Sequence, residues 1–279
     1  MAIRIFFALL TLVVLGLAIA SSFYIIEKVE KPKDEVVREI KEATPPKPID
    51  PGIREFDAAL ALLRNRQLIA GRDKLRYIIR YFPKSERYAA ARRICSEMNL
   101  DMLISPNFSE NKTAYEVKRG DVLSLIANKH GTTIECIARV NGLSKYNISP
   151  GDHLDLLPLD FTVEVSTKEK KLTLSHGGEF FAEYDIGEVN LPKNVSLPLE
   201  DQVRVKLASI GQMRVSEIDS GYDGASKKLI LRKRGLSISP TLEEAKSEES
   251  AETGIFMDPV DIAELTMLLR VGTPIRVAL

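Results

Sequence analysis

Apolar residues form an uninterrupted run near the start of the chain. Residues 5–26 carry no charge, and Arg4 precedes them. About 20 apolar residues span a bilayer as a helix, whose positive end stays inside. We therefore predict that 1–26 is a signal anchor and that the rest of the chain lies outside the cytoplasm, on the periplasmic side. A cleaved signal peptide, which would free the protein into the periplasm, is the alternative, because residues 18–20 before Ser21 fit a small-x-small cleavage site.

The following residues change from charged and proline-rich to helical in pattern. Residues 27–52 have few apolar side chains and predict a semi-rigid linker. Between 53 and 104 apolar residues recur at helical spacing, and Pro83 interrupts them, so helices are expected there. The stretch 78–93 resembles the helix–turn–helix of tetratricopeptide-like proteins. That resemblance implies a surface for an envelope protein partner, and a small helical spacer is the alternative.

A unit of strand, helix, helix and strand is predicted between residues 113 and 158. Asp121 is expected to cap the first helix, Thr132 or Thr133 can begin the second, and Asn141-Gly142 ends it. Gly-Asp stands before the first helix, Asn-Gly after the second and Pro-Gly before the closing strand. This order resembles a LysM module. The resemblance implies binding to glycans that contain N-acetylglucosamine, such as peptidoglycan.

The resemblance places a glycan-binding groove between the loop after the first strand and the loop before the second. Backbone amides and carbonyls exposed in two tight loops can bind an acetamido group. Leu123 and Ile148 are expected to contact a sugar face, and Val122 replaces the more common Thr or Ser. The alternative is that the module packs structurally and binds no sugar. The expected glycan-binding residues are Gly120, Asp121, Val122, Leu123, Asn147, Ile148, Ser149, Pro150 and Gly151.

Alternating apolar residues predict strands from residue 161 onward. Glycines at 177 and 178 suit a hairpin turn, and the next strand is expected to end at Gly187. Near the end of the chain, Asp258 and Pro259 suit the start of a helix that leads into a final strand. Both ends of 161–279 resemble the L,D-transpeptidase (YkuD-type) domain. The resemblance implies a mainly-β domain in this range.

The chemistry of that family is missing from this range. A cysteine thiolate attacks the peptide and a histidine activates it in such enzymes. The family position of the cysteine falls at or near Gly254, that of the histidine at Arg234, and that of a motif arginine at Phe256. Both cysteines of the chain precede residue 161, and a serine nucleophile would have no neighbouring histidine. We therefore expect no catalytic residue here.

Composition excludes some classes of function. Lys and Arg number 39, as do Asp and Glu, so the net charge is zero, and a nucleic-acid partner is not expected. The 2 cysteines and 3 histidines leave little for a disulfide framework or a structural metal site. No metal and no cofactor is therefore expected.

Together these patterns predict a multidomain α+β protein. It combines a transmembrane helix, a small helical hairpin region, a βααβ LysM module and a mainly-β L,D-transpeptidase-like domain. The expected bounds are 1–26 for the anchor, 27–52 for the linker, 53–104 for the helical segment, 113–158 for LysM and 161–279 for the last domain.

The function predicted from these parts is that of a scaffold or adaptor of the bacterial cell wall. The chain would be held at the membrane by its N-terminal helix, would bind peptidoglycan through LysM, and would carry an inactive transpeptidase-like domain. The alternative is an active cell-wall L,D-transpeptidase or hydrolase that uses an unrecognised nucleophile.

Overall fold

The computed structural model separates the chain into two units, residues 1–49 and residues 50–279. The predicted linker lies mostly outside the described residues, and so does Arg234. The structure describes residues 2–30, 37–38, 49–108, 111–143, 146–192, 195–217, 219, 221–233, 235–241 and 253–279.

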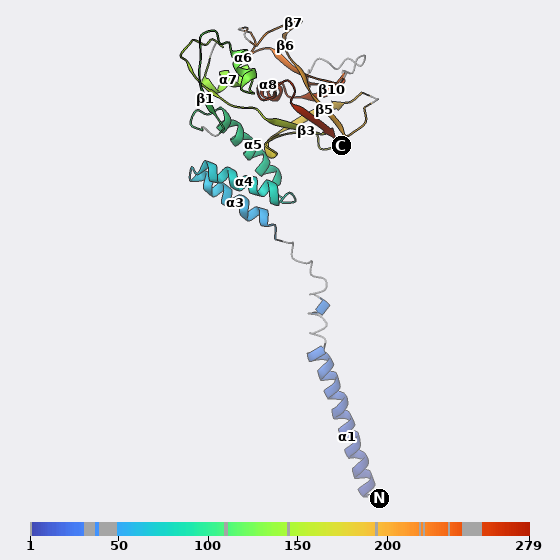
Figure 1. Ribbon diagram of the computed structural model, residues 1–279. Coiled ribbons are helices and arrows are strands. Elements are labelled where there is room, and N and C mark those ends of the chain that lie inside the picture. Colours follow the sequence, from blue (N-terminus) through green and yellow to red (C-terminus); the bar gives the residue numbers. More distant parts are fainter. Residues whose placement is uncertain are drawn as a thin grey trace. The chain divides into compact units, whose positions relative to one another are not determined.

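The first unit contains the predicted apolar helix. Helix α1 (Ala2–Ile25) continues into a short π-helix, η1 (Ile26–Glu30) (Figure 1). The stretch Leu10–Lys28 is long and apolar enough to cross a membrane, and none of it is buried against protein. Both a membrane anchor and a signal sequence have these properties.

Three helices begin the second unit: α3 (Pro51–Arg64), α4 (Leu68–Tyr81) and α5 (Tyr88–Ile104). One oxygen of the Asp50 carboxylate accepts from the Gly52 amide at 2.8 Å and caps α3. Its other oxygen accepts from the Ser85 hydroxyl and the Glu86 amide, so the start of α3 is tied to the turn between α4 and α5. The helices share a core of Phe56, Ala59, Leu75, Ile78, Ala91 and Cys95.

The predicted strand–helix–helix–strand unit is present. Strand β1 (Thr113–Glu116) pairs antiparallel with β2 (His153–Leu156), and α6 (Leu123–Lys129) and α7 (Ile134–Asn141) lie between them in sequence. The Thr133 hydroxyl accepts from the Cys136 amide and caps α7, while Gly142 ends that helix at a φ of 63°. Buried apolar residues give the unit its own core.

The remaining chain forms a nine-stranded sheet that closes on itself. Its order is β11-β3-β4-β5-β10-β9-β8-β6-β7, and β11 also pairs with β6. The strands are β3 (Phe161–Ser166), β4 (Lys171–His176), β5 (Glu179–Asn190), β6 (Leu199–Ile210), β7 (Met213–Arg214), β8 (Ser226–Leu231), β9 (Ser237–Pro240), β10 (Gly254–Met257) and β11 (Pro274–Ala278).

The two long strands make this closure possible. The first part of β5 pairs with β4 and its last part with β10, while β6 pairs first with β11 and then with β8. The prediction that a strand ends at Gly187 is wrong, because β5 needs its last residues, to Asn190, for pairing with β10. Helix α8 (Pro259–Leu268) buries Ile262, Leu265 and Leu268 in the core of this domain.

Polar contacts hold the three parts of the second unit together. From α5, the Asn99 amide donates to the carbonyl of Phe181 on β5 at 2.8 Å, and Arg92 pairs with Glu183 of the same strand at 2.5 Å. From α7, Glu135 accepts from Lys227 on β8. The helical segment and the LysM-like unit are therefore packed on the sheet domain within one compact body.

Candidate glycan-binding site

Two turns of the LysM-like unit have the same hydrogen bonds. In Lys118–Asp121, the Asp121 amide donates to the carbonyl of Lys118 at 3.1 Å, and its carboxylate accepts from the Lys118 amide at 2.8 Å. In Ser149–Asp152, the corresponding distances are 3.0 Å and 2.7 Å. Each turn has a glycine before its aspartate, so both loops are built on one local pattern.

The glycines make these turns possible. Gly120 has a φ of 89° and Gly151 a φ of 94°, values that other L residues rarely adopt. Pro150 stands before the second glycine, where its fixed φ suits a turn. Open space surrounds both glycines, because a Cβ added at either would meet nothing within 4 Å. A ligand can therefore approach the backbone of both turns.

Val117 holds the two turns side by side. Its amide donates to the carbonyl of Asp152 at 2.9 Å, and its carbonyl accepts from the Gly151 amide at 2.8 Å. Val117, which directly precedes the first turn, is thus hydrogen-bonded to Gly151 and Asp152, the last two residues of the second turn. The structure brings together the two loops that the sequence assigned to one site.

The expected site residues differ in their access to solvent. Gly120, Val122, Asn147, Ser149, Pro150 and Gly151 are exposed. Ile148 is partly buried and packs against the unit's core. The expected contact of Leu123 with a sugar face is wrong, since this side chain is only 5% exposed and belongs to the core. The exposed apolar side chains near the first turn are those of Val122 and Leu125.

The predicted helix cap at Asp121 is also wrong. The N-cap of α6 is Val122, and no side chain caps this helix. The Asp121 carboxylate is instead held by the Lys118 amide and by the Tyr115 hydroxyl, which donates to it at 2.7 Å. These hydrogen bonds, that from Lys118 first, lower the pKa of Asp121. The carboxylate therefore stabilises the turn and stays ionised at neutral pH.

Asp152 was missed in the sequence, although a signal for it is present. The dipeptide Gly-Asp occurs at the end of both turns, at 120–121 and at 151–152. The predicted site includes both residues of the first pair but only the glycine of the second. Repetition of the dipeptide, thirty-one residues apart, would have identified Asp152 as the second residue that closes a loop.

Two of the three positions that the sequence predicts for the family motif lie on β10. Gly254 is buried, and a Cβ added there would lie 2.8 Å from the carbonyl oxygen of Ser237 on β9. Real Cβ atoms essentially never come that close to another atom. Phe256, at the predicted position of the motif arginine, is partly buried on the same strand. The backbone of β9 thus leaves no room for a side chain at position 254.

Both thiols of the chain are buried in other parts of the fold. Cys95 lies in the core of the helical segment, and Cys136 lies in α7. Burial raises the pKa of both, that of Cys136 to about 11. A thiol with such a pKa stays protonated at neutral pH and is a poor nucleophile.

Residues 115–156 match the LysM domain family. The N-acetylmuramoyl-L-alanine amidase sle1 of Staphylococcus saprophyticus is 55% identical over 42 residues, which cover 15% of this chain and 13% of that protein. The protein of the same name from Staphylococcus aureus strain USA300 is 40% identical over 68 residues, which cover 24% of this chain and 20% of that protein. The chain thus spans a fifth or less of the length of these curated relatives.

Solved L,D-transpeptidases are among the structures similar to this chain. One from Mycobacterium smegmatis has a TM-score of 0.32 and 12% identity, over 47% of this chain and 65% of that one. One from Stackebrandtia nassauensis has a TM-score of 0.31 and 15% identity, over 42% of this chain and 55% of that one. At these TM-scores the likeness assigns no role to any residue of this chain.

Proposed function

We propose that this chain is a membrane-anchored protein of the cell envelope that binds peptidoglycan through its LysM module. The observation that carries the proposal is the LysM match over residues 115–156, together with the two open Gly-Asp turns held side by side by Val117. The amidases that share this module act on a bond of N-acetylmuramoyl-L-alanine, according to their names. The residues that these amidases share with this chain include the LysM module. We therefore propose that glycan binding is the property that they have in common with this chain.

The two turns would bind the sugar through their backbone. Both present glycines without side chains, so an acetamido group can reach peptide N–H and C=O groups directly. Val122, 49% exposed, would supply the apolar contact that the buried Leu123 does not. Single shallow grooves of this kind bind weakly, since much of the contact energy offsets lost translational freedom.

The sheet domain is proposed to be catalytically inactive and to serve as a scaffold or adaptor. Residues 161–279 contain no cysteine, and position 254 has no space for one. An active transpeptidase or hydrolase with another nucleophile is the second candidate, but nothing in the part of the chain that the structure describes favours it. A protein partner on the helical segment is a further part of the proposal that rests on its resemblance to tetratricopeptide-like helices.

Position 122 offers a sharp test of glycan binding. Asp at this position would place a charge in the groove, yet Asp is a favoured N-cap, so α6 should be stabilised rather than unfolded. Val122→Asp should therefore pellet with purified sacculi at least about tenfold more weakly than wild type. Val260→Asp, which also places a charge on an exposed valine (75%), is the matched control and should pellet normally. Equal pelleting of both variants would argue against the groove.

The proposed anchor predicts the side of the membrane on which the chain lies. A protease added to spheroplasts should digest residues 50–279, because the positive end of α1 stays inside. Full protection from the protease would contradict an extracytoplasmic location. A mature protein that begins at Ser21 would favour the signal peptide over the anchor.

A further inference from the structure

We propose that the outer face of α4 docks on the surface of the bilayer that holds α1. The docking surface is a row of side chains along this helix, called here the α4 stripe, which consists of Ile69, Asp73, Tyr77 and Tyr81. Residues four positions apart lie on one face of a helix, so these four are neighbours. The proposal rests on the proposed membrane anchor and does not depend on glycan binding by the LysM module.

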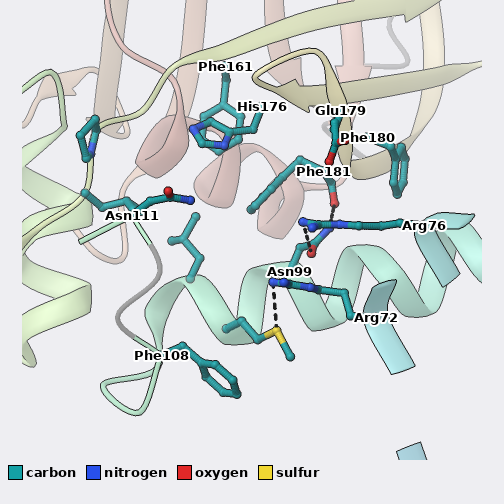
Figure 2. A pocket seen from close by; sticks show the side chains of 14 residues that line it. Arg72, Arg76, Asn99, Phe108, Asn111, Phe161, His176, Glu179, Phe180 and Phe181 are labelled. Carbon is teal, nitrogen blue, oxygen red and sulfur yellow. Dashed lines mark hydrogen bonds between the residues drawn. The ribbon is translucent and has the colours of Figure 1, made fainter. Parts of the chain in front are cut away.

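The other faces of α4 are used by the fold itself. Leu75 and Ile78 are fully buried in the core of the helical segment, on the side of the helix opposite the α4 stripe. Arg72 and Arg76 border a cavity of about 180 Å³ that residues of α5 and of the β4–β5 hairpin also line (Figure 2). There the Nη2 of Arg76 donates to the side-chain oxygen of Asn99 at 3.2 Å. The α4 stripe, in contrast, is exposed along its whole length.

The α4 stripe places large apolar side chains next to one another in solvent. Ile69 is 54% exposed, Tyr77 44% and Tyr81 57%. The rings of the two tyrosines are in contact, with their centroids 4.8 Å apart. Contiguous exposed apolar side chains mark surfaces that bind a protein or a membrane. Tyrosine is enriched at the level of the lipid headgroups, because its ring is apolar and its hydroxyl is polar.

The charge of the helical segment favours an anionic surface. Residues 53–104 contain 11 Lys and Arg against 6 Asp and Glu, although the whole chain is neutral. The acidic member of the α4 stripe, Asp73, lies 3.6 Å from the Nε of Arg72 and 3.9 Å from the Nη1 of Arg76, so its charge is balanced locally. A basic surface with exposed apolar side chains is attracted to a bilayer that contains anionic lipids.

The chain enters the second unit beside one end of the α4 stripe. Asp50, with which this unit begins, accepts from the Ser85 hydroxyl at 2.8 Å and from the Glu86 amide at 2.9 Å. Both donors lie in the turn that follows Tyr81, the last residue of α4.

This attachment keeps the bilayer available to the α4 stripe. Whatever its conformation, the chain from Ile25, the end of α1, to Asp50 spans at most about 90 Å. Because α1 is proposed to span the membrane, the bilayer stays within that distance of the second unit. Tethering raises the effective concentration of the bilayer above that of a protein that has to be recruited. Among the surfaces that could cover the stripe, the bilayer is therefore favoured.

Fluorescence quenching on the full chain in vesicles tests the proposal. Both native thiols are buried, so a cysteine introduced at an exposed position can be labelled selectively with bimane. The vesicles consist of phosphatidylcholine and phosphatidylglycerol and carry nitroxide groups on their headgroups. The label in Ile69→Cys should be quenched at least about twofold more than the label in Val260→Cys, because the quencher reaches only side chains that lie against the headgroups.

Val260→Cys is the matched control, since it replaces another exposed aliphatic residue, 75% exposed, on the same tether. Val260 lies across α5 from α4, where it lines a cavity together with Leu100 and Ile104. Equal quenching of the two labels in a chain that floats with the vesicles would overturn the docking of α4 alone and would leave the stripe to a protein partner. A chain that does not float with the vesicles would contradict the anchor and the docking together.

A second variant tests the tyrosines of the α4 stripe. Tyr77→Ser combined with Tyr81→Ser should lower the quenching of the label at position 69 by at least about half, because both rings supply apolar contact with the bilayer. Both side chains are exposed, so this variant should melt at the same temperature as the chain with its tyrosines. Unchanged quenching in a variant that is folded would contradict the proposed surface.

Discussion

The carboxylate of Glu135 accepts a hydrogen bond from the ammonium of Lys227 at 2.8 Å, although the two residues are 92 positions apart. Glu135 lies on α7 of the LysM module and Lys227 on β8 of the sheet domain. The other oxygen of Glu135 accepts from Lys206 on β6 at 3.0 Å. All three side chains are 10% exposed or less. A buried ionic cluster therefore fixes the module on the sheet domain.

Removal of the Glu135 charge should destabilise the folded chain strongly. Glu135→Gln would remove the carboxylate that pairs with buried Lys227 and leave Lys206 paired with Glu217 alone, and breaking a buried pair costs about 3–5 kcal/mol. The free energy of unfolding in urea measures this loss. Glu200→Gln is the matched control, because its ion pair with Arg276 is exposed on both sides and such pairs contribute about 0–1 kcal/mol. Similar losses in the two variants would contradict a buried cluster.

Threonine at position 122 should stabilise the LysM module. Val122 is the N-cap of α6 and supplies no side-chain hydrogen bond. The threonine side chain has nearly the same shape as that of valine, and its hydroxyl can accept a hydrogen bond from the helix. Val122→Thr is expected to raise the free energy of unfolding by about 0.5–1 kcal/mol. Thermal unfolding of the full chain checks the direction. A lower melting temperature would show that the cap is not formed.

A cysteine placed at the family position should not restore chemistry. In Gly254→Cys, the new Cβ would lie 2.8 Å from the Ser237 carbonyl, so β9 and β10 would have to separate. We expect a lower melting temperature and no specific acylation by a carbapenem, measured by mass spectrometry. Val260→Cys, which places a thiol at an exposed position, gives the background rate. Faster acylation of Gly254→Cys than of this control would contradict the proposal that the sheet domain is catalytically inactive.

The stability of the sheet domain should depend on the ionisation of Asp261. Burial, followed by the nearby carboxylates of Asp258, Glu264 and Asp185, raises the pKa of Asp261 to about 6. The folded chain thus binds this proton more tightly than the unfolded chain, whose carboxyl has its ordinary pKa. The resulting stabilisation is complete below about pH 4, near the ordinary aspartate pKa, and is lost as pH rises through about 6.

Asp261→Asn isolates this contribution, because an amide does not ionise. The variant should gain stability relative to wild type between pH 5 and pH 8, and the difference should be smallest near pH 4. Melting temperatures of both proteins across this range provide the measurement. A difference that does not change with pH would exclude Asp261 as the titrating group.

Much of the LysM module could be read directly from local sequence. Thr133, one of the two predicted candidates, caps its second helix and Gly142 ends it, since a cap and a positive φ depend on the residue itself and its immediate neighbours. The positions of the two exposed turns could be predicted from the dipeptides Gly-Asp and Pro-Gly. The same local reasoning failed at Asp121. Its carboxylate was expected to cap α6, and only the fold shows that it accepts from the Lys118 amide and the Tyr115 hydroxyl instead.

In the sheet domain, too, local sequence predicts some features and the fold alone decides others. Alternation located β3 and β4 correctly, because a period of two depends on neighbouring residues alone. The continuation of β5 beyond Gly187 could not be read from it, since those residues are held by β10, more than sixty positions later. Likewise, β11 pairs with both β3 and β6 and so closes the sheet. A local alternation of apolar residues cannot predict such long-range contacts.

The sequence alone determined the absence of a cysteine from residues 161–279, the apolar N-terminal helix and the order of the LysM elements. The tertiary structure decided which of those residues meet. It buries Leu123, brings the Ser237 carbonyl against Gly254, and places Arg76 at a cavity that residues of the sheet domain also line. Each of these depends on segments far apart along the chain, whose approach is set by the packing of whole elements rather than by local preference.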